Sequence, residues 1–181
     1  VTTGVQNTLM GSFSGDALTD ADLNVAVGYQ ALSADTKGSR SVAVGYSALF
    51  SQNFTSSTDS FNTAVGDSAG QQITTGKHNT LIGGRAGDAL TDGTYNVAIG
   101  DQSLSNDTRG SRSVAVGYGA LNPQNQTSAV DTYNIGIGYT AGNAMSTGIY
   151  NTLIGGKAGD AIQDAQLAIV VGYNSDTNAS G

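Results

Sequence analysis

The sequence predicts an all-β fold, a parallel β-solenoid of about ten coils, and three features of the chain support this. A short motif, Asn24–Leu32 in its clearest copy, returns from one end of the 181 residues to the other. The opening residues of the motif alternate between two sides, and a glycine ends the alternation in every copy. Repeats of one short unit at a fixed period are typical of stacked, quasi-one-dimensional folds.

The repeat units divide the chain into nearly equal steps. The spacing from Asn7 to Asn24 separates most successive units, and two long units, which begin at Ser41 and Ser113, each contain four extra residues. The order of short and long units recurs as a super-repeat. We therefore expect a single repeat domain, residues 1–181, made of two super-repeats and part of a third. The units begin at Asn7, Asn24, Ser41, Asn62, Asn79, Asn96, Ser113, Asn134, Asn151 and Ala168, and the super-repeats begin at Asn7, Asn79 and Asn151.

Composition favours a thin core and argues against several classes of function. The chain has 26 Gly, one Pro and 38% hydrophobic residues, so each coil buries little apolar surface by itself. The net charge of −7 predicts no nucleic-acid partner, because phosphates repel such a surface. No apolar run approaches the ~18 residues of a membrane span, so we predict no membrane insertion. Cysteine is absent, which excludes thiolate metal sites and disulfides.

The start of each unit reads as a short strand. Val25 and Val27 point to one side of an extended segment, whereas Ala26 and Gly28 point to the other. The first side is β-branched in nearly every copy, which predicts that it packs inside the coil. The second side is small, with exceptions such as Leu81, which predicts that another backbone approaches it closely.

The glycine that ends each strand predicts a corner. Glycine tolerates positive φ and close backbone contact, which a tight bend requires. The Lys-Ser/Thr ending of a phosphate-binding loop is missing, so we predict no cofactor. In the complete inner units these structural glycines are Gly28, Gly45, Gly66, Gly83, Gly100, Gly117, Gly138 and Gly155.

After the corner, each unit delivers one bulky apolar side chain to a second wall of the coil. Some units do so with an early Leu, such as Leu32, and others have Gly there and a large residue three positions later, such as Leu90. The residue before each unit start forms a further column that we expect to stack coil over coil. Its members are Leu23, Arg40, Phe61, His78, Tyr95, Arg112, Tyr133, Tyr150 and Leu167.

The two long units predict loops that protrude from the stack. Amide, hydroxyl and aromatic groups on loops are suited to the recognition of glycans or proteins, although a plain surface insertion explains them equally well. The candidate recognition residues are Phe50, Asn53, Phe54, Asp59, Asn122, Gln124, Asn125 and Gln126.

The polar residues predict neither a metal site nor an enzyme. Asp16 and its counterparts Asp88 and Asp160 offer oxygen ligands suited to Ca²⁺, but the spacings of EF-hands and calcium-binding β-rolls are absent. We therefore interpret them as solvated turn residues. His78 has no triad or second ligand near it in the sequence, and polar groups that recur in register are unlike a catalytic set.

Several motifs resemble those of a known class of fibrous proteins. The segments Asn62–Gly66, Asn96–Gly100 and Ser113–Leu121 are similar to repeats of phage tail-fibre shafts and to the head repeats of trimeric autotransporter adhesins. The resemblance covers essentially the whole chain. It implies a left-handed β-roll formed by three chains, with the small-residue face near the threefold axis. Autotransporter heads usually have shorter units, and no segment of these residues reads as a coiled-coil stalk or a membrane anchor, which favours a fibre. None reads as a chaperone domain either, so an excised or self-cleaved shaft is expected.

These features together predict a structural role. The small-residue face needs a close neighbour, which favours a homotrimer, intertwined or side by side. We expect a segment of a viral fibre exposed on the virion, supporting attachment to a glycan or protein of the host surface. The alternative is the head of a bacterial surface adhesin. A hexapeptide-repeat acyltransferase needs units in multiples of six, and an ice-binding solenoid needs a regular Thr array, and neither pattern is present.

Overall fold

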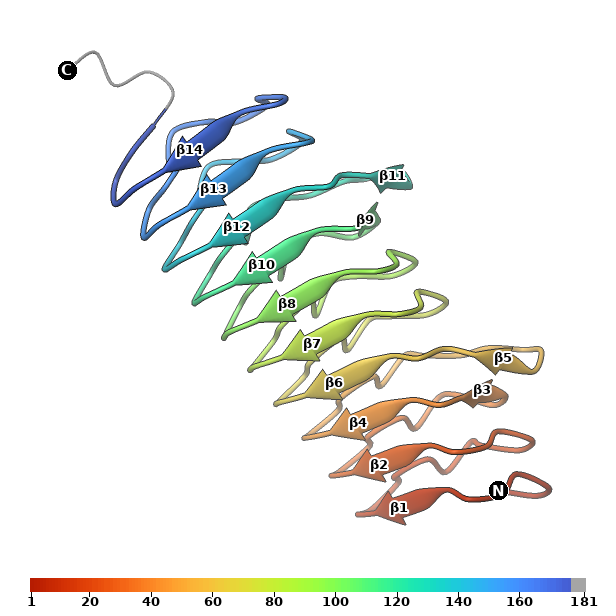
Figure 1. The fold of residues 1–181 in the computed structure, drawn as a ribbon. Coiled ribbons are helices and arrows are strands. Elements are labelled where there is room, and N and C mark those ends of the chain that lie inside the picture. Colours follow the sequence, from red (N-terminus) through yellow and green to blue (C-terminus); the bar gives the residue numbers. More distant parts are fainter. Residues whose placement is uncertain (177–181) are drawn as a thin grey trace.

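The computed structural model describes residues 1–176 as one stack of coils, with no helix in that range (Figure 1). Residues 177–181, the end of the predicted repeat domain, lie outside the described residues. One parallel sheet of ten short strands runs the length of the stack. Its strands are β1 (Thr8–Met10), β2 (Val25–Val27), β4 (Val42–Val44), β6 (Thr63–Val65), β7 (Thr80–Ile82), β8 (Val97–Ile99), β10 (Val114–Val116), β12 (Ile135–Ile137), β13 (Thr152–Ile154) and β14 (Ile169–Val171).

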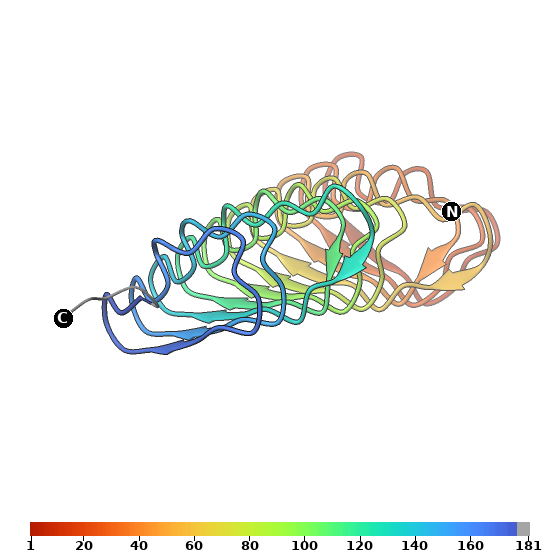
Figure 2. The same cartoon turned by 90° about the horizontal axis from the view of Figure 1, so that it is seen from above.

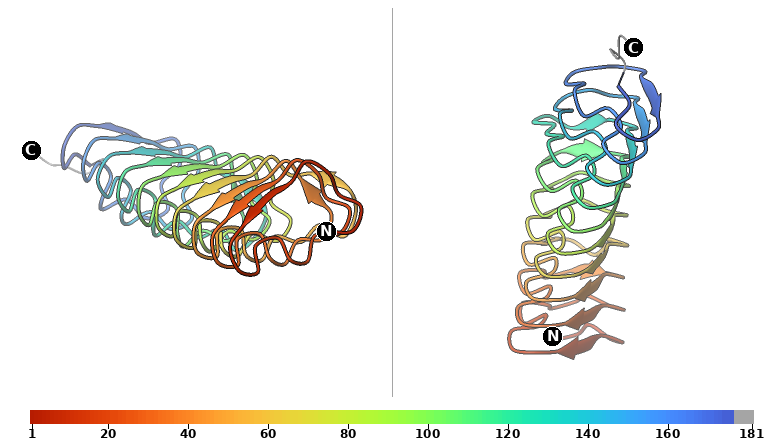
Figure 3. Two further views of the ribbon diagram at one scale, coloured as in Figure 1. Left: turned by 90° about the horizontal axis from the view of Figure 1, so that it is seen from below. Right: turned by 90° about the vertical axis from the view of Figure 1, so that its left-hand side faces the viewer.

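Each strand pairs with its equivalent in the next coil. Val25 is opposite Val42, and Val97 is opposite Val114, so the register follows the repeat spacing without slippage. The coil is flattened, with the strands on one wall and a run of turns on the opposite wall (Figures 2 and 3). We call these the strand wall and the turn wall. The solenoid predicted from the sequence is therefore present, whereas its left hand and its trimeric state stay predictions.

The two long coils add a second, smaller type of pairing. β3 (Gly38–Ser39) pairs in parallel with β5 (Thr58–Asp59), and β9 (Gly110–Ser111) pairs in the same way with β11 (Val130–Asp131). In Figure 1 the ends of the coil at β5 and β11 reach farther out than the coils next to them. The four extra residues thus widen each long coil enough to form a ladder with the coil before it.

The strand wall points its small residues into the coil and its β-branched residues outward, which is the reverse of the orientation predicted from the sequence. Ala26, Ala43 and Ala98 are fully buried, whereas Ile82 and Ile99 on the other side are each 38% exposed. The prediction that β-branched residues fill the coil was therefore wrong. The physical reason is the narrow interior, in which a Leu or Ile from the turn wall leaves room only for a small residue on the strand wall.

Large and small residues alternate inside the coil so that its width stays constant. Leu81 replaces the usual Ala on the strand wall in a coil whose turn wall has Gly87, and a Cβ on Gly87 would lie 2.8 Å from Leu81 Cδ2. Conversely, a Cβ on Gly136 would lie 2.6 Å from Leu121 Cγ. The predicted bulky residues of the turn wall are all buried: Leu32, Leu49, Ile73, Leu90, Leu104, Leu121, Met145 and Ile162.

The corner glycines have the conformation that the sequence predicted. In the eight named above, φ lies between +129° and +142°. A Cβ on Gly100 would lie 2.5 Å from the carbonyl oxygen of Gly117 in the next coil. Both the dihedral angle and the stacking distance therefore require glycine at this corner.

The coils also bend at residues with side chains in the left-handed region. Gln102, Leu104 and Arg112 have φ of +58°, +53° and +66°, and equivalent residues do the same in other coils. Each such residue costs about 1–2 kcal/mol relative to ordinary backbone. The packing of Leu104 in the core and the stacking of Arg112 on its neighbours help to offset this cost.

A buried asparagine ladder joins the coils along the axis. Asn96 Oδ1 accepts a hydrogen bond from the backbone N–H of Ser113 in the next coil (2.9 Å), and Asn96 Nδ2 donates to the carbonyl of Gly110 (2.9 Å). The same pair of bonds recurs at the asparagines that begin other units. The members of this ladder are Asn7, Asn24, Asn62, Asn79, Asn96, Asn134 and Asn151.

Candidate functional site

The long coils place the eight candidate recognition residues in three different environments. Phe54, Gln124 and Gln126 are buried, so the prediction that they contact a partner was wrong. Their side chains fill the wider interior that the four extra residues create. Asn53, Asp59 and Asn125 are exposed, and Phe50 and Asn122 are half-buried. The surface available for recognition on these loops is therefore smaller than the sequence predicted.

The first long coil contains a buried polar cluster. Gln52 Nε2 donates to Asp35 Oδ2 (2.6 Å) and to Ser41 Oγ (2.9 Å), and Gln52 Oε1 accepts from Asn62 Nδ2 (2.8 Å). Asp35 Oδ1 accepts from the backbone N–H groups of Gly38 and Phe54, each at 3.0 Å. All polar atoms of the Asp35 carboxylate are thus satisfied although the residue is fully buried.

The second long coil repeats this cluster at the equivalent place of the next super-repeat. Gln124 joins Asp107, Ser113 and Asn134 in the same way, and Asp107 Oδ1 accepts from the backbone N–H groups of Gly110 and Gln126. We call the two groups the polar hubs. They explain why Ser stands at the start of the long units where other units have Asn, since the hub glutamine occupies the space of the missing amide. The hubs stabilise the coil and, being fully buried, offer nothing to a ligand.

The outward face of the ten-stranded sheet is an exposed, mostly apolar surface that runs the length of the stack. Two columns of mostly β-branched residues run along it, and exposure reaches 38% even at the central positions Ile82 and Ile99. This face was not predicted from the sequence, because the β-branched residues were expected to lie in the interior. The more exposed column consists of Met10, Val27, Val44, Val65, Ile82, Ile99, Val116, Ile137, Ile154 and Val171.

A stacked column of planar groups borders this face, as the sequence predicted. His78 lies between Phe61 and Tyr95, with ring centroids 5.2 and 4.7 Å away and nearly parallel planes. The guanidinium of Arg112 lies 4.9 Å from the ring centroid of Tyr95 and 5.6 Å from that of Tyr133. Each such contact contributes about 0.5–1.5 kcal/mol, so the column reinforces the stack of coils.

Ion pairs on the surface also link neighbouring coils. Arg40 pairs with Asp59 (3.1 Å), Arg112 with Asp131 (3.0 Å) and Arg109 with Asp92 (2.6 Å). The hydrogen bond from the Arg109 guanidinium lowers the pKa of the Asp92 carboxyl below its ordinary value. In the same direction, hydrogen bonds from the hydroxyls of Thr147 and Ser146 lower the pKa of Asp164. These carboxylates therefore have structural partners in the adjacent coil.

Within residues 1–176, no group of three or more His, Cys, Asp or Glu is arranged to hold a metal ion, and the repeated Asp residues of the turns do not converge. The same range contains no helix with the length and apolar character needed to cross a membrane.

Comparisons with known proteins found no similar protein, so a functional proposal must be based on the geometry described above. The chain matches no model of a protein family, no curated protein and no solved structure.

Proposed function

We propose that this chain is a non-enzymatic structural segment of a viral fibre, exposed on the virion, in which three copies associate to form a shaft. The observation that carries the proposal is the exposed apolar face of the ten-stranded sheet. Monomeric soluble proteins rarely expose a continuous apolar surface that runs the length of the molecule. Burial of this face between copies would supply the core that each thin coil lacks.

The charge distribution is compatible with self-association through the strand wall. The chain has a net charge of −7, which opposes contact between copies in general. None of the Asp residues belongs to the two outward columns of the sheet or to the adjacent column of planar groups. The negative charge therefore lies outside the proposed contact.

The number of copies comes from the resemblance to fibre and adhesin repeats, which form trimers. The resemblance placed the small-residue face at the threefold axis, but that face is buried within each coil. In the proposed trimer the β-branched face takes its place. A bacterial surface adhesin head is the alternative, since it would use the same assembly.

Sedimentation equilibrium tests the proposed assembly. The wild-type chain of 18.2 kDa should sediment with three times that mass. The double variant Ile82→Lys/Ile99→Lys places two charges on the exposed apolar column and should dissociate to monomers. Gln72→Lys adds a charge at an exposed position of the turn wall and serves as the matched control, which should remain trimeric. A wild-type monomer, or a trimer unaffected by the double variant, would contradict the proposal.

Recognition of a host-surface glycan or protein is a second part of the proposed function. The exposed Asn53, Asp59 and Asn125 lie on the long coils and offer hydrogen-bonding groups to a partner. Glycan-array binding by the wild type, lost when residues 55–58 are deleted, would support this role. Unchanged binding after the deletion would assign the loops to structure alone.

A further inference from the structure

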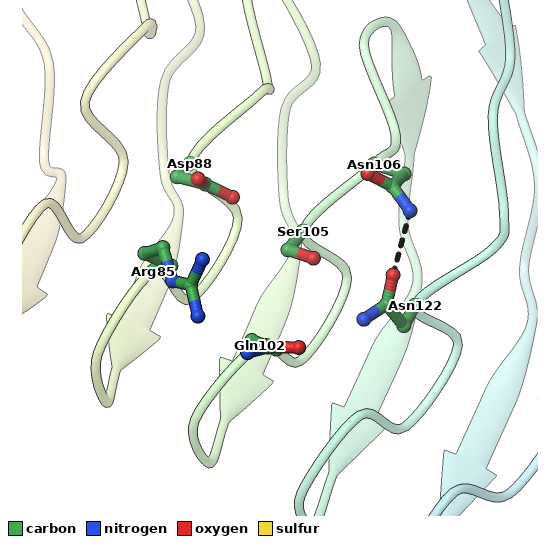
Figure 4. Close-up of a pocket in the computed structure, with 6 residues that line it drawn as sticks. All are labelled: Arg85, Asp88, Gln102, Ser105, Asn106 and Asn122. Carbon is green, nitrogen blue, oxygen red and sulfur yellow. Dashed lines mark hydrogen bonds between the residues drawn. The ribbon is translucent and has the colours of Figure 1, made fainter.

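The turn wall contains a pocket made entirely of polar side chains. It has a volume of about 220 Å³ and is lined by Arg85, Asp88, Gln102, Ser105, Asn106 and Asn122. These residues come from three successive coils (Figure 4). Figure 4 also shows that Arg85 and Asp88 point toward the coil that carries Gln102 and Ser105. The pocket therefore lies between coils, away from the outward face of the sheet.

The pocket occurs where the two super-repeats differ. The preceding super-repeat has identical residues at three of the six lining positions, namely Asp16, Gln30 and Ser33. The other three are replaced by Phe13, Ala34 and Phe50 in the positions of Arg85, Asn106 and Asn122. At these positions a cation and two amides thus replace two aromatic residues and an alanine of the preceding super-repeat, and the partial third super-repeat again has a cation, Lys157, in the position of Arg85. Departures from a regular pattern that add polar groups are expected at functional positions.

The polar groups of the pocket have unused hydrogen-bonding capacity. The Arg85 guanidinium forms no ion pair or side-chain hydrogen bond within residues 1–176. Asp88 Oδ1 is inaccessible to solvent and has no hydrogen-bond partner in the described structure. Burial raises the pKa of the Asp88 carboxyl, and backbone N–H groups of Asp88 and Ala89 together with the nearby Arg85 charge oppose that rise. Buried polar atoms without partners are uncommon in native proteins, so Asp88 Oδ1 is an unusual feature of this wall.

One hydrogen bond holds the far side of the pocket in place. Asn106 Nδ2 donates to Asn122 Oδ1 at 2.7 Å, which orients both amides. This bond leaves the Asn106 carbonyl as an acceptor and the Asn122 amino group as a donor. Fixed donors and acceptors then lie opposite the carboxylate and the guanidinium, so the site requires little ordering when a ligand binds.

We propose that this pocket binds a neutral saccharide. A sugar hydroxyl both donates and accepts, so a single hydroxyl can donate to Asp88 while accepting from Arg85. An anionic ligand would meet the Asp88 carboxylate, and a cationic one would meet the Arg85 guanidinium. The absence of aromatic and aliphatic side chains among the six lining residues disfavours apolar ligands and nucleobases.

The proposed site is independent of the proposed trimer. It lies on the turn wall, whereas the trimer contact would involve the outward side of the strand wall, so the pocket stays open in either oligomeric state. A failure to bind sugar would leave the sedimentation result untouched. In the same way, a monomeric result in sedimentation would leave the sugar-binding proposal untouched, because three successive coils of a single chain complete the pocket.

Saturation-transfer NMR on the full chain tests the proposal, with glucose, galactose, mannose and N-acetylglucosamine as probes at millimolar concentration. We expect transfer to the ring protons of at least one sugar. The triple variant Arg85→Phe/Asn106→Ala/Asn122→Phe copies the residues of the preceding super-repeat, where the same fold accommodates them. It should keep the melting temperature of the wild type and lose the transfer signal. Asp88→Ala should also lose it.

The matched control is Asp16→Ala, which removes the equivalent carboxylate in the super-repeat that lacks the cation and the amides. Its transfer signal should equal that of the wild type. Glucuronate and glucosamine should give weaker signals than glucose, since each carries a charge. The proposal is overturned if no neutral sugar gives a signal, if both Asp88→Ala and the triple variant retain it, or if a charged sugar binds better.

Discussion

The short coil around Leu90 and the long coil around Gln124 fill the same interior position with opposite chemistry. In the first, Gly87 makes room for Leu90, and the coil is closed by apolar contact. In the second, Leu121 occupies the position equivalent to Gly87, and the position of Leu90 becomes the glutamine of a polar hub. The comparison shows that equivalent interior positions can be filled either by an apolar side chain or by a fully hydrogen-bonded polar one.

The hubs occur where the four extra residues interrupt the asparagine ladder. Ser113 cannot reach the next coil as Asn96 does, and Gln124 supplies the missing amide from the other wall. A hydrogen-bonded network requires a particular register of coils, because a shift would leave buried groups without partners. We infer that the apolar coils supply most of the burial and that the hubs fix the register of the long coils.

The largest expected effect comes from the corner that both kinds of coil share. Gly100→Ala should lower the free energy of unfolding by more than about 4 kcal/mol, because its Cβ collides with the Gly117 carbonyl and φ is +129°. Gly119→Ala is the control, since its Cβ would meet only Thr140 Cγ2 at 3.5 Å. It should cost about 1 kcal/mol. Urea unfolding measures both, and equal losses would contradict the stacking geometry.

The next effect separates the two kinds of coil directly. Leu90→Ala should cost about 3 kcal/mol by leaving a cavity, and Leu90→Met less than about 1.5 kcal/mol because Met145 fills the equivalent place in another coil. Urea unfolding of the two variants measures both losses. Equal losses would show that the size of the side chain at this position does not matter.

Gln124→Ala should cost about 3 kcal/mol for a different reason, since it removes one buried hydrogen bond from each of Asp107, Ser113 and Asn134. Asn125→Ala, its exposed neighbour, should change the unfolding free energy by no more than about 0.5 kcal/mol. If Gln124→Leu were as stable as the wild type, the hub would be replaceable by apolar packing and the comparison would fail.

A smaller loss of stability is expected when a ladder asparagine is replaced by serine, the residue that begins the long units. Asn96→Ser should cost about 2 kcal/mol, because the backbone N–H of Ser113 and the carbonyl of Gly110 both lose buried partners. Serine is accommodated at position 113 because Gln124 compensates for it there. Amide hydrogen exchange at Ser113 measures the loss locally, and unchanged protection would contradict the role given to Asn96.

The smallest expected effect is electrostatic. The pKa of Asp92 is lowered in the folded chain, so its contribution is present above the unfolded pKa and is lost as pH falls through the folded value. Because both partners are partly exposed, solvent screens the ion pair with Arg109 and its contribution is small. Asp92→Asn should therefore reduce the dependence of stability on pH in the acidic range. An identical pH profile for the two proteins would show that the pair contributes nothing.

The regular part of the fold was predictable because it depends on spacing. Unit starts, corner glycines and the stacked column around His78 follow from residues that recur in register. The orientation of the strand wall was not predictable from one strand, since Val-Ala-Val fits a pleat either way round. Whether Ala26 faces inward depends on the Leu of the opposite wall, which is a tertiary contact.

The polar hubs and the pocket on the turn wall could not be predicted from the repeat pattern either. Gln124 was predicted to lie on a surface loop, and nothing in the sequence places it next to Asp107, although its position in the apolar column of Leu90 was a usable signal. The left-handed φ of Leu104 and Arg112 has no signature in residue type, because such residues rarely adopt it. The pocket could not be predicted because its lining residues come together only when three successive coils are in contact.

Pulsed electron–electron double resonance on spin-labelled cysteines tests the stack of parallel coils most directly, because the chain has no cysteine of its own. Labels in place of Ser12 and Asp101 occupy equivalent positions five coils apart, and labels in place of Ser12 and Tyr173 occupy equivalent positions nine coils apart. At about 4.8 Å per coil, the expected separations are about 24 and about 43 Å, with labelled chains diluted in unlabelled protein. Distances that do not grow in the ratio of five to nine would contradict the account.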